Sequence, residues 1–316
     1  MHPAISIIIP LYNEEEVFPL LKERLQGIMK SPDYSLEIVM VDDGSTDSTP
    51  ALMEQLAVED GRFQAVFLSR NFGHQQALSA GLMHVRATEA VMIIDGDLQD
   101  PPELVFDFFR KLKEGYDVVY AVRRKRKEGL LKKLAYFLFY RIQRRMTNIR
   151  IHADSGDFCM MSTRVVRILN DMPEDNRFLR GMRSWVGFKQ YGFEYERAER
   201  KAGRSKYSLR MLVNLAYNGI FNFSALPIRF ITSLGLYAIL LSLGYLTYTL
   251  VRKFWFDDVP SGFTGILVAI IMLGGVQLIS IGVVGEYVVR IFQQTKGRPR
   301  FIVKEHIVDQ KSVTGI

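Results

Sequence analysis

The sequence predicts an α/β protein with a doubly wound, mostly parallel sheet, followed by a hairpin of two membrane-spanning helices. Three observations predict this fold class. Short unbroken apolar runs alternate with segments of helical pattern through residues 5–122, which is typical of a parallel sheet covered on both faces. Polar clusters follow several of these runs, where open α/β sheets bind their ligands. Two long stretches without a charged residue lie in the C-terminal third.

Each expected strand is a short apolar run that ends at polar or turn-forming residues. The expected strands are Ile5–Pro10, Leu36–Val41, Ala65–Leu68, Val91–Ile94 and Asp117–Val122. Pro10 is expected to stop the first strand. Glu14–Glu16 are then expected in the first turn of a helix, where acidic side chains suit the helix dipole. Gly44 allows a sharp turn after the second strand, and Ser48 or Thr49 can cap the next helix.

The residues after the fourth strand carry the strongest chemical signal. Asp95 and Asp97 are two residues apart, so their carboxylates point to the same side if the extended geometry persists. Gly96 between them removes a side chain, which lets a ligand approach the backbone. Two carboxylates with the amide oxygen of Gln99 suit a hard divalent cation such as Mg²⁺ or Mn²⁺. A polar turn is the alternative, whereas an EF-hand is excluded because Asp100 stands where such a loop needs Gly.

The composition narrows the function classes. The chain is basic, with 41 Lys and Arg against 34 Asp and Glu. Cys159 is the single cysteine, so an internal disulfide is excluded, and the five scattered histidines match no zinc motif. The sequence contains neither a Walker A motif nor Gly-x-Gly-x-x-Gly. The apolar run Ile5–Leu11 is too short for a signal peptide.

Residues 123–150 are strongly basic, with eleven Lys and Arg against one acid, Glu128. Apolar residues recur every three to four positions over about 130–148, which predicts a basic amphipathic helix lying in a membrane interface. An ordinary surface helix is the common alternative, and nucleic-acid binding through the basic cluster Arg123–Lys127 is another. A second amphipathic segment is expected at about 208–223.

Two uncharged stretches, Ile231–Val251 and Gly262–Gly285, are each long enough to cross the hydrocarbon core of about 30 Å. They predict transmembrane helices at about 231–251 and 262–288, between a domain of residues 1–228 and a basic tail of residues 291–316. The basic residues that flank the pair are Arg229, Arg290, Lys296, Arg298 and Arg300. This bias places the α/β domain and both termini in the cytoplasm, at the inner membrane. The neighbouring membrane helices also weaken the nucleic-acid interpretation.

Taken together, these features resemble a family 2 glycosyltransferase of the polyprenyl-phosphate type, the group that includes dolichyl-phosphate mannose synthases and bactoprenol glucosyltransferases. The resemblance extends over nearly the whole chain, including the two-helix C-terminal part. Its motifs are Ile7–Glu14, Val41–Ser45, Ser69–Gly73, Asp95–Glu103, Ser155–Phe158 and Gly203–Tyr207. No single motif is decisive, but the ordered set is specific and is closest to the bactoprenol branch.

The resemblance implies a GT-A fold, a nucleotide-sugar donor such as UDP-glucose, an undecaprenyl-type polyprenyl phosphate acceptor and an inverting single displacement. It also implies roles for individual residues. The nucleotide sugar would be bound by Pro10, Tyr12, Glu14, Asp43 and Asp95. Mg²⁺ or Mn²⁺ would be bound by Asp97 and Gln99, and acceptor phosphate by Arg123, Lys132 and Lys206. Asp157, Arg123 and Asp97 are the expected catalytic residues, with Asp157 either a base or a group that orients a basic residue.

Other functions remain open. A processive glycan synthase would carry Gln-x-x-Arg-Trp, and the nearest stretch, Arg180–Trp185, does not match it. A nucleotide-binding module without catalysis is disfavoured by the intact Asp97 and Gln99. The sugar could instead be N-acetylglucosamine, galactose, mannose or a modified sugar. The sequence does not define the oligomeric state, and a homo-tetramer is one possibility that related enzymes suggest.

Overall fold

The computed structural model describes residues 2–31, 34–123, 155–175, 177–196, 226–256 and 262–314. These residues form two compact units. Residues up to 196 and those from 298 onward make one unit, and residues 226–256 with 262–297 make the other. The predicted amphipathic helices at 130–148 and 208–223 lie outside the described residues.

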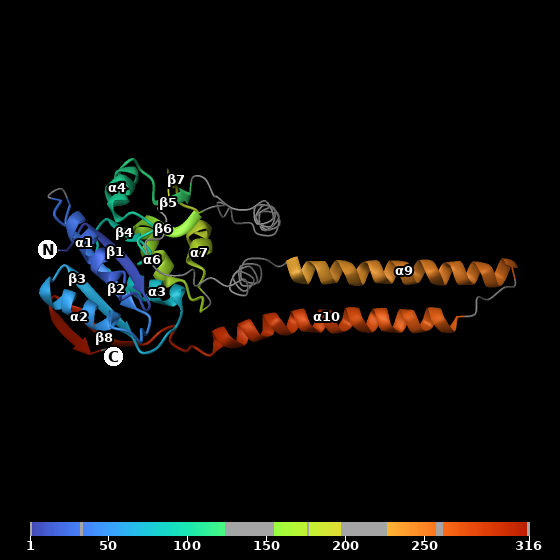
Figure 1. The fold of residues 1–316 in the computed structure, drawn as a ribbon. Helices are drawn as coiled ribbons and strands as arrows, with labels where there is room; N and C mark the ends of the chain where they lie inside the picture. Colours follow the sequence, from blue (N-terminus) through green and yellow to red (C-terminus); the bar gives the residue numbers. More distant parts are fainter. Residues whose placement is uncertain are drawn as a thin grey trace. The chain divides into compact units, whose positions relative to one another are not determined.

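The first unit is organised around one sheet, in which the described residues supply nine strands in the order β7-β5-β6-β4-β1-β2-β3-β8-β9. The strands are β1 Ile5–Leu11, β2 Leu36–Asp42, β3 Phe63–Leu68, β4 Ala90–Ile93, β5 Val118–Arg123, β6 Ser155–Ser162, β7 Gln190–Tyr195, β8 Val303–Val308 and β9 Lys311–Thr314. The central strands β4, β1, β2 and β3 are parallel, and β6 runs antiparallel between β4 and β5. The predicted doubly wound, mostly parallel sheet is therefore confirmed (Figure 1).

Helices cover both faces of this sheet. They are α1 Phe18–Ile28, α2 Thr49–Glu59, α3 His74–His84, α4 Val105–Lys113 after the short 3₁₀ turn Pro102–Leu104, α6 Thr163–Asp171 and α7 Leu179–Trp185. Ile7 packs in the core with α1, α2 and α4, whereas Ile8, which points to the opposite face, lies against α3. Both isoleucines have no exposed surface. Burial on both faces explains why the strands read as unbroken apolar runs.

Two expectations about the start of the chain are wrong. Strand β1 continues through Pro10 to Leu11, where it still pairs with β2, whereas the ladder between β1 and β4 ends at Ile8 opposite Ile93, before Pro10. The missing N–H of Pro10 therefore breaks no ladder hydrogen bond. Helix α1 begins only at Phe18 and has no acid in its first turn. Glu14–Glu16 instead form the turn before the helix.

The last strands extend the sheet beyond β3. Strand β8 pairs antiparallel with β3, and β9 folds back on β8 through a turn in which Asp309 and Gln310 both have positive φ, 50° and 63°. Gln310 donates to the carbonyl of Val58 at 2.9 Å, which holds the turn against α2. Residues 303–314 thus belong to the first unit, although the sequence analysis treated them as part of a tail.

A buried carboxylate links this C-terminal hairpin to the central strands. Glu37 is 1% exposed and accepts hydrogen bonds from Ser6 Oγ at 2.6 Å, from Gln64 Nε2 at 2.5 Å and from Arg86 Nε at 2.6 Å. Arg86 also donates to Asp309 at 2.8 Å. One guanidinium therefore bridges strand β2 and the β8–β9 turn.

The second unit consists of two helices, α9 Leu226–Phe256 and α10 Phe263–Thr295, which contact each other as an antiparallel pair (Figure 1). At 31 and 33 residues they are about 46 and 50 Å long, slightly more than the full thickness of a bilayer with its headgroups. Their segments Phe230–Trp255 and Met272–Thr295 have mean hydropathies of 1.7 and 1.6. Both helices are long and apolar enough to cross a membrane.

Replacing Arg86 tests the link through Glu37. Arg86→Leu would leave a buried carboxylate without its cation, which typically costs about 3–5 kcal/mol. We expect a clearly lower thermal midpoint for the detergent-solubilised variant. Arg62→Leu is the matched control, because Arg62 pairs with Asp60 at the surface, where an ion pair contributes about 0–1 kcal/mol. Equal small shifts in the two variants would show that Glu37 does not depend on Arg86.

Candidate active site

The loops that follow β1 and β2 are joined by hydrogen bonds between backbone and side chains. The amide of Asn13 donates to Ser45 Oγ at 2.9 Å, and the amide of Thr46 donates to Asn13 Oδ1 at 2.8 Å. The amide of Glu14 donates to Thr49 Oγ1 at 2.9 Å. These bonds place residues 12–16 and 42–49 together at the carboxyl edge of the sheet. Ser48 precedes helix α2 as expected, but its side chain makes no capping bond.

Asp43 attaches a third loop to the same edge. Its carboxylate is almost fully buried and accepts the amide of Phe72 at 2.7 Å and that of Gly73 at 3.0 Å. Burial raises the pKa of Asp43, and these two amides partly offset the rise. A carboxylate has about four lone-pair sites, so Asp43 retains some acceptor capacity beyond these two amides. Its first role in this structure is to hold residues 69–73.

Gly44 makes the close approach of these loops possible. It has a φ of +71°, and a Cβ at this position would lie 2.5 Å from the backbone carbon of Arg70 and the amide nitrogen of Asn71. A side chain would therefore push the two loops apart. This agrees with the sharp turn expected from the sequence.

The turn after β4 differs from the expectation in two respects. The chain leaves the extended conformation at Gly96 and Asp97, where Asp97 Oδ1 accepts the amide of Gln99 at 3.1 Å, so the simple same-side geometry does not persist. A Cβ on Gly96 would lie 2.5 Å from Leu11 Cδ2 and 3.3 Å from the carbonyl oxygen of Pro10. Gly96 thus lets this turn pack against β1 and does not expose the backbone to a ligand.

Charged side chains from four elements meet beside this turn. His74, at the start of α3, lies between Asp95 and Asp157, with its Nε2 3.7 Å from Asp95 Oδ1 and 3.7 Å from Asp157 Oδ2. Arg180 of α7 approaches the same Asp157 oxygen at 3.5 Å, and Gln75 Nε2 donates to it at 3.2 Å. We call these five residues the Asp157 cluster.

Most side chains of this cluster are charged near pH 7, because their neighbours and their burial set the pKa values of Asp157, His74 and Asp95. Burial alone would raise the pKa of Asp157, but Arg180 and His74 hold it well below its usual range. Burial alone would lower the pKa of His74, but Asp157 and Asp95 raise it to about 9. Burial raises the pKa of Asp95 to about 6 despite His74. The cluster is therefore a network of ion pairs.

The sequence analysis gave Asp95 a role in nucleotide-sugar binding and Asp157 a catalytic role, but it did not foresee that they lie close together, and it missed His74, Gln75 and Arg180. His74 and Gln75 directly follow the Ser69–Gly73 motif, which was the available signal. Arg180 was weighed only as part of a motif that failed to match.

The donor set fits a hard divalent cation in kind. Asp97 and Gln99 offer oxygen ligands, and Asp95 Oδ1 is buried without a hydrogen-bond partner. Within the described ranges no three His, Cys, Asp or Glu side chains form a metal-binding group. Mg²⁺ commonly binds one or two carboxylates and takes its other ligands from water and substrate phosphates, so the residues present are compatible with it.

The other expected site residues are placed less completely. Tyr12 is 38% exposed beside the joined loops, and Pro10 is buried within β1. Arg123 ends β5 at the same carboxyl edge, but its side chain lies outside the description. Lys132 and Lys206 lie outside the described residues altogether.

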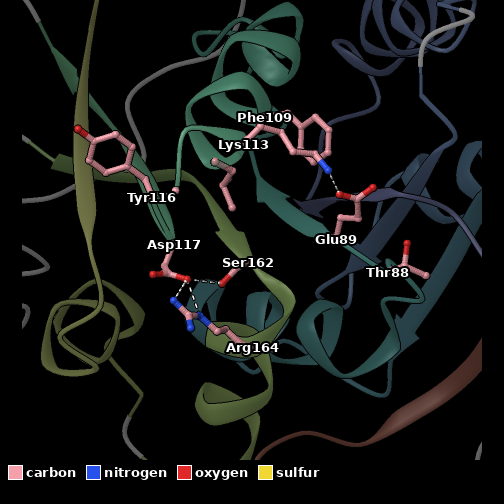
Figure 2. Close-up of a pocket in the computed structure, with 10 residues that line it drawn as sticks. Thr88, Glu89, Phe109, Lys113, Tyr116, Asp117, Ser162 and Arg164 are labelled. Carbon is pink, nitrogen blue, oxygen red and sulfur yellow. Dashed lines mark hydrogen bonds and ion pairs between the residues drawn. The ribbon is translucent and has the colours of Figure 1, made fainter.

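A surface hollow of about 390 Å³ lies at the opposite edge, near the amino ends of β4 and β5 (Figure 2). Its charges are paired, since Lys113 contacts Glu89 and Arg164 contacts Asp117 at 2.5 Å. The hollow is remote from the strand ends that bear the Asp157 cluster.

The mostly parallel sheet with acidic residues at its strand ends fits the GT-A-like fold class. The chain belongs to glycosyl transferase family 2, whose model matches residues 6–169, and the model of the GtrB C-terminal hairpin matches residues 226–291.

Individual relatives are similar to this chain over nearly its full length. An uncharacterized glycosyltransferase of Synechocystis sp. is 41% identical over 95% of both chains. The uncharacterized glycosyltransferase YkcC of Bacillus subtilis is 39% identical over 96% of this chain and 94% of its own. The bactoprenol glucosyl transferase of Shigella phage SfII is 40% identical over 95% and 97%.

Substituting Gly44 tests the packing of the loops. Gly44→Ala would force residues 42–45 and 69–73 apart, so we expect at least about tenfold weaker binding of a nucleoside diphosphate, a loss of about 1.4 kcal/mol. The measurement is titration calorimetry in detergent. Gly61→Ala is the control, because a Cβ there meets nothing nearer than Gln310 Cγ at 3.6 Å. Unchanged affinity in Gly44→Ala would separate these loops from nucleotide binding.

Proposed function

We propose that the protein transfers one glucose from UDP-glucose to a polyprenyl phosphate of the undecaprenyl type, with inversion at the anomeric carbon. The observation that carries this proposal is the 40% identity to a bactoprenol glucosyl transferase over nearly the full length of both chains. The match of the hairpin model to residues 226–291 supports a lipid acceptor, because a polyprenyl chain stays in the bilayer.

The nucleoside of the donor would be bound at the joined loops. Tyr12 and Glu14 follow β1, Asp43 follows β2, and Asp95 follows β4, so all four lie at the carboxyl edge of adjacent parallel strands. Ligands of open α/β sheets bind at this edge. Pro10 lies within β1, just before Tyr12, and would contribute to the same nucleoside-binding region.

The reaction is a displacement at the anomeric carbon of the sugar. A phosphate oxygen of the acceptor attacks this carbon, the bond to the diphosphate oxygen breaks, and its electron pair leaves with the nucleoside diphosphate. A phosphate monoester has its second pKa near about 6, so near pH 7 the acceptor is largely a dianion and no proton has to be removed. Negative charge grows on the departing diphosphate.

Residues of this chain would neutralise that charge. Asp97 and Gln99 would hold Mg²⁺ or Mn²⁺, which when bound supplies positive charge to the diphosphate. Arg123 at the end of β5 would contact a phosphate of donor or acceptor. Lys132 lies in the sequence segment 124–154 and Lys206 in the segment 197–225. Both would attract the lipid phosphate.

The composition of the two units supports the proposed membrane arrangement. Residues up to 196 and residues from 298 onward share one sheet, so the chain must cross a membrane an even number of times between them. Two helices satisfy this condition. The basic residues beside them favour a cytoplasmic catalytic unit with both termini on the same side, at the inner membrane.

A panel of nucleotide sugars tests the reaction. Protein purified in detergent is incubated with labelled UDP-glucose, UDP-N-acetylglucosamine, UDP-galactose or GDP-mannose and a polyprenyl phosphate. We expect one lipid-linked sugar from UDP-glucose, and loss of product on chelation with recovery on adding Mg²⁺ or Mn²⁺. Another donor would correct the sugar, and a polymeric product would favour a processive synthase.

Asp97→Asn in the same assay is expected to remove activity while the protein stays folded, since one charged metal ligand is lost, an effect of several kcal/mol. Asp107→Asn is the control, because Asp107 lies on α4 and contacts Arg110 at the surface. Full activity of Asp97→Asn would exclude Asp97 as a ligand.

Reporter fusions test the topology. A reporter after Ile316 is expected to read as cytoplasmic and one inserted near Pro260 as periplasmic, because the basic residues flank the outer ends of the hairpin. The readout is paired alkaline phosphatase and green fluorescent protein activity. Export of the C-terminal fusion would invert the proposed orientation.

A further inference from the structure

One oxygen of Asp157 receives three polar groups, while the other receives none. Gln75 Nε2 lies 3.2 Å from Oδ2, Arg180 lies 3.5 Å from it and His74 Nε2 lies 3.7 Å from it. Oδ1 is buried and has no hydrogen-bond partner among the described residues. The Asp157 side chain is only 12% exposed. The carboxylate thus sits at the junction of α3, β6 and α7.

This environment does not suit a general base. An effective base has a pKa near the working pH, whereas Arg180 and His74 hold the pKa of Asp157 well below its ordinary value. The acceptor phosphate, moreover, has no proton that must be removed. The arrangement instead suits a carboxylate that holds cations in place.

Helix α7 is fastened so that Arg180 stays at this junction. The amide of Leu179 donates to Gln75 Oε1 at 2.9 Å, and the same Gln75 side chain donates to Asp157. Arg183, one turn further along, is 3% exposed and packs over the ring of Tyr120. The Arg180 side chain is 22% exposed and remains accessible to a ligand. The two arginines of α7 therefore have different surroundings.

We propose that Asp157 is a positioning residue and that Arg180, which it holds, is a catalytic residue that contacts the sugar-bearing phosphate of the donor diphosphate. The inference rests on the proposed function. Asp95, Asp97 and Asp157 would together repel a diphosphate. Among the described residues, the cations whose charge acts on Asp157 are His74 and Arg180 of the cluster and the neighbouring Arg183.

A guanidinium is suited to this task. It donates two parallel hydrogen bonds to phosphate oxygens and remains charged at any relevant pH. As the bond between the anomeric carbon and the diphosphate breaks, the electron pair passes to the phosphate oxygen, and Arg180 donates to the phosphate without transferring a proton. Such bonds strengthen as charge develops, so they accelerate the chemical step.

A double-mutant cycle separates a positioning role from a base. Arg180→Gln and Asp157→Asn are each expected to lower kcat about 100- to 1,000-fold, the range seen when one stabilising donor is lost. The double variant is expected to lie within about threefold of Arg180→Gln, because two residues that act as a unit are not additive. Losses that multiply would show that Asp157 acts independently of Arg180 and would overturn the proposal.

Binding gives a second readout that does not depend on turnover. Arg180→Gln is expected to weaken binding of UDP at least about tenfold, or about 1.4 kcal/mol, and to leave UMP binding unchanged, since UMP lacks the phosphate that carries the sugar. Arg180→Lys should recover part of the UDP affinity, because it keeps the charge without the paired donors. Equal weakening of UDP and UMP would assign α7 to the nucleoside and refute the contact.

Controls distinguish the possible failures. Arg164→Gln removes an exposed arginine that pairs with Asp117 at the opposite edge and should change neither kcat nor UDP binding (Figure 2). Thermal midpoints identify a variant that does not fold. If Arg180→Gln does not fold, the binding of UDP and UMP is compared in Arg180→Lys instead. If the wild-type protein transfers no sugar to any acceptor, the proposed function fails, while the comparison of UDP with UMP still decides the role of Arg180.

Discussion

The buried carboxylate of Asp43 is the interaction on which the carboxyl edge of the sheet depends. By accepting the amides of Phe72 and Gly73, it fixes the loop from which α3 begins. The first residue of α3, His74, then lies between two further carboxylates, and the second, Gln75, joins α3 to α7. Local hydrogen bonds at the end of one strand thus determine where groups from distant parts of the chain can meet. This is a case of side chains positioned by a supporting shell of backbone contacts.

The sequence predicted the parallel sheet because strands buried on both faces leave a local signature, an unbroken apolar run. It predicted which strand ends carry polar groups for the same reason. It could not predict that Gln75 and Leu179 touch, since they lie 104 positions apart and no periodicity encodes that contact. The strands after residue 302 were missed because they are short and their side chains alternate weakly. Pro10 was wrongly expected to end the first strand, because whether a proline fits within a strand depends on where the pairing with the neighbouring strand ends.

The two units differ in how they manage charge. In the first unit, charged side chains of opposite sign form ion pairs at the carboxyl edge of the sheet. In the second, charged residues lie only towards the helix ends: α9 carries Arg229, Arg252 and Lys253, and in α10 Glu286 accepts from Arg290 of the same helix at 2.9 Å. An ion pair within one helix lowers the cost of placing charge near a membrane interface. The water-soluble donor and lipid acceptor of the proposed reaction would call for these two environments in one chain.

The position of β8 has a consequence for biogenesis. The edge of β3 is completed by residues that leave the ribosome only after both apolar helices have been made. Until then β3 presents unpaired backbone groups, which are a known template for unwanted strand pairing. With the proposed membrane arrangement, insertion into the bilayer becomes a step in folding the sheet, because the returning chain has to be delivered to the same side before the sheet can close. A cell in which the translocation machinery is slow would accumulate this protein with one open edge.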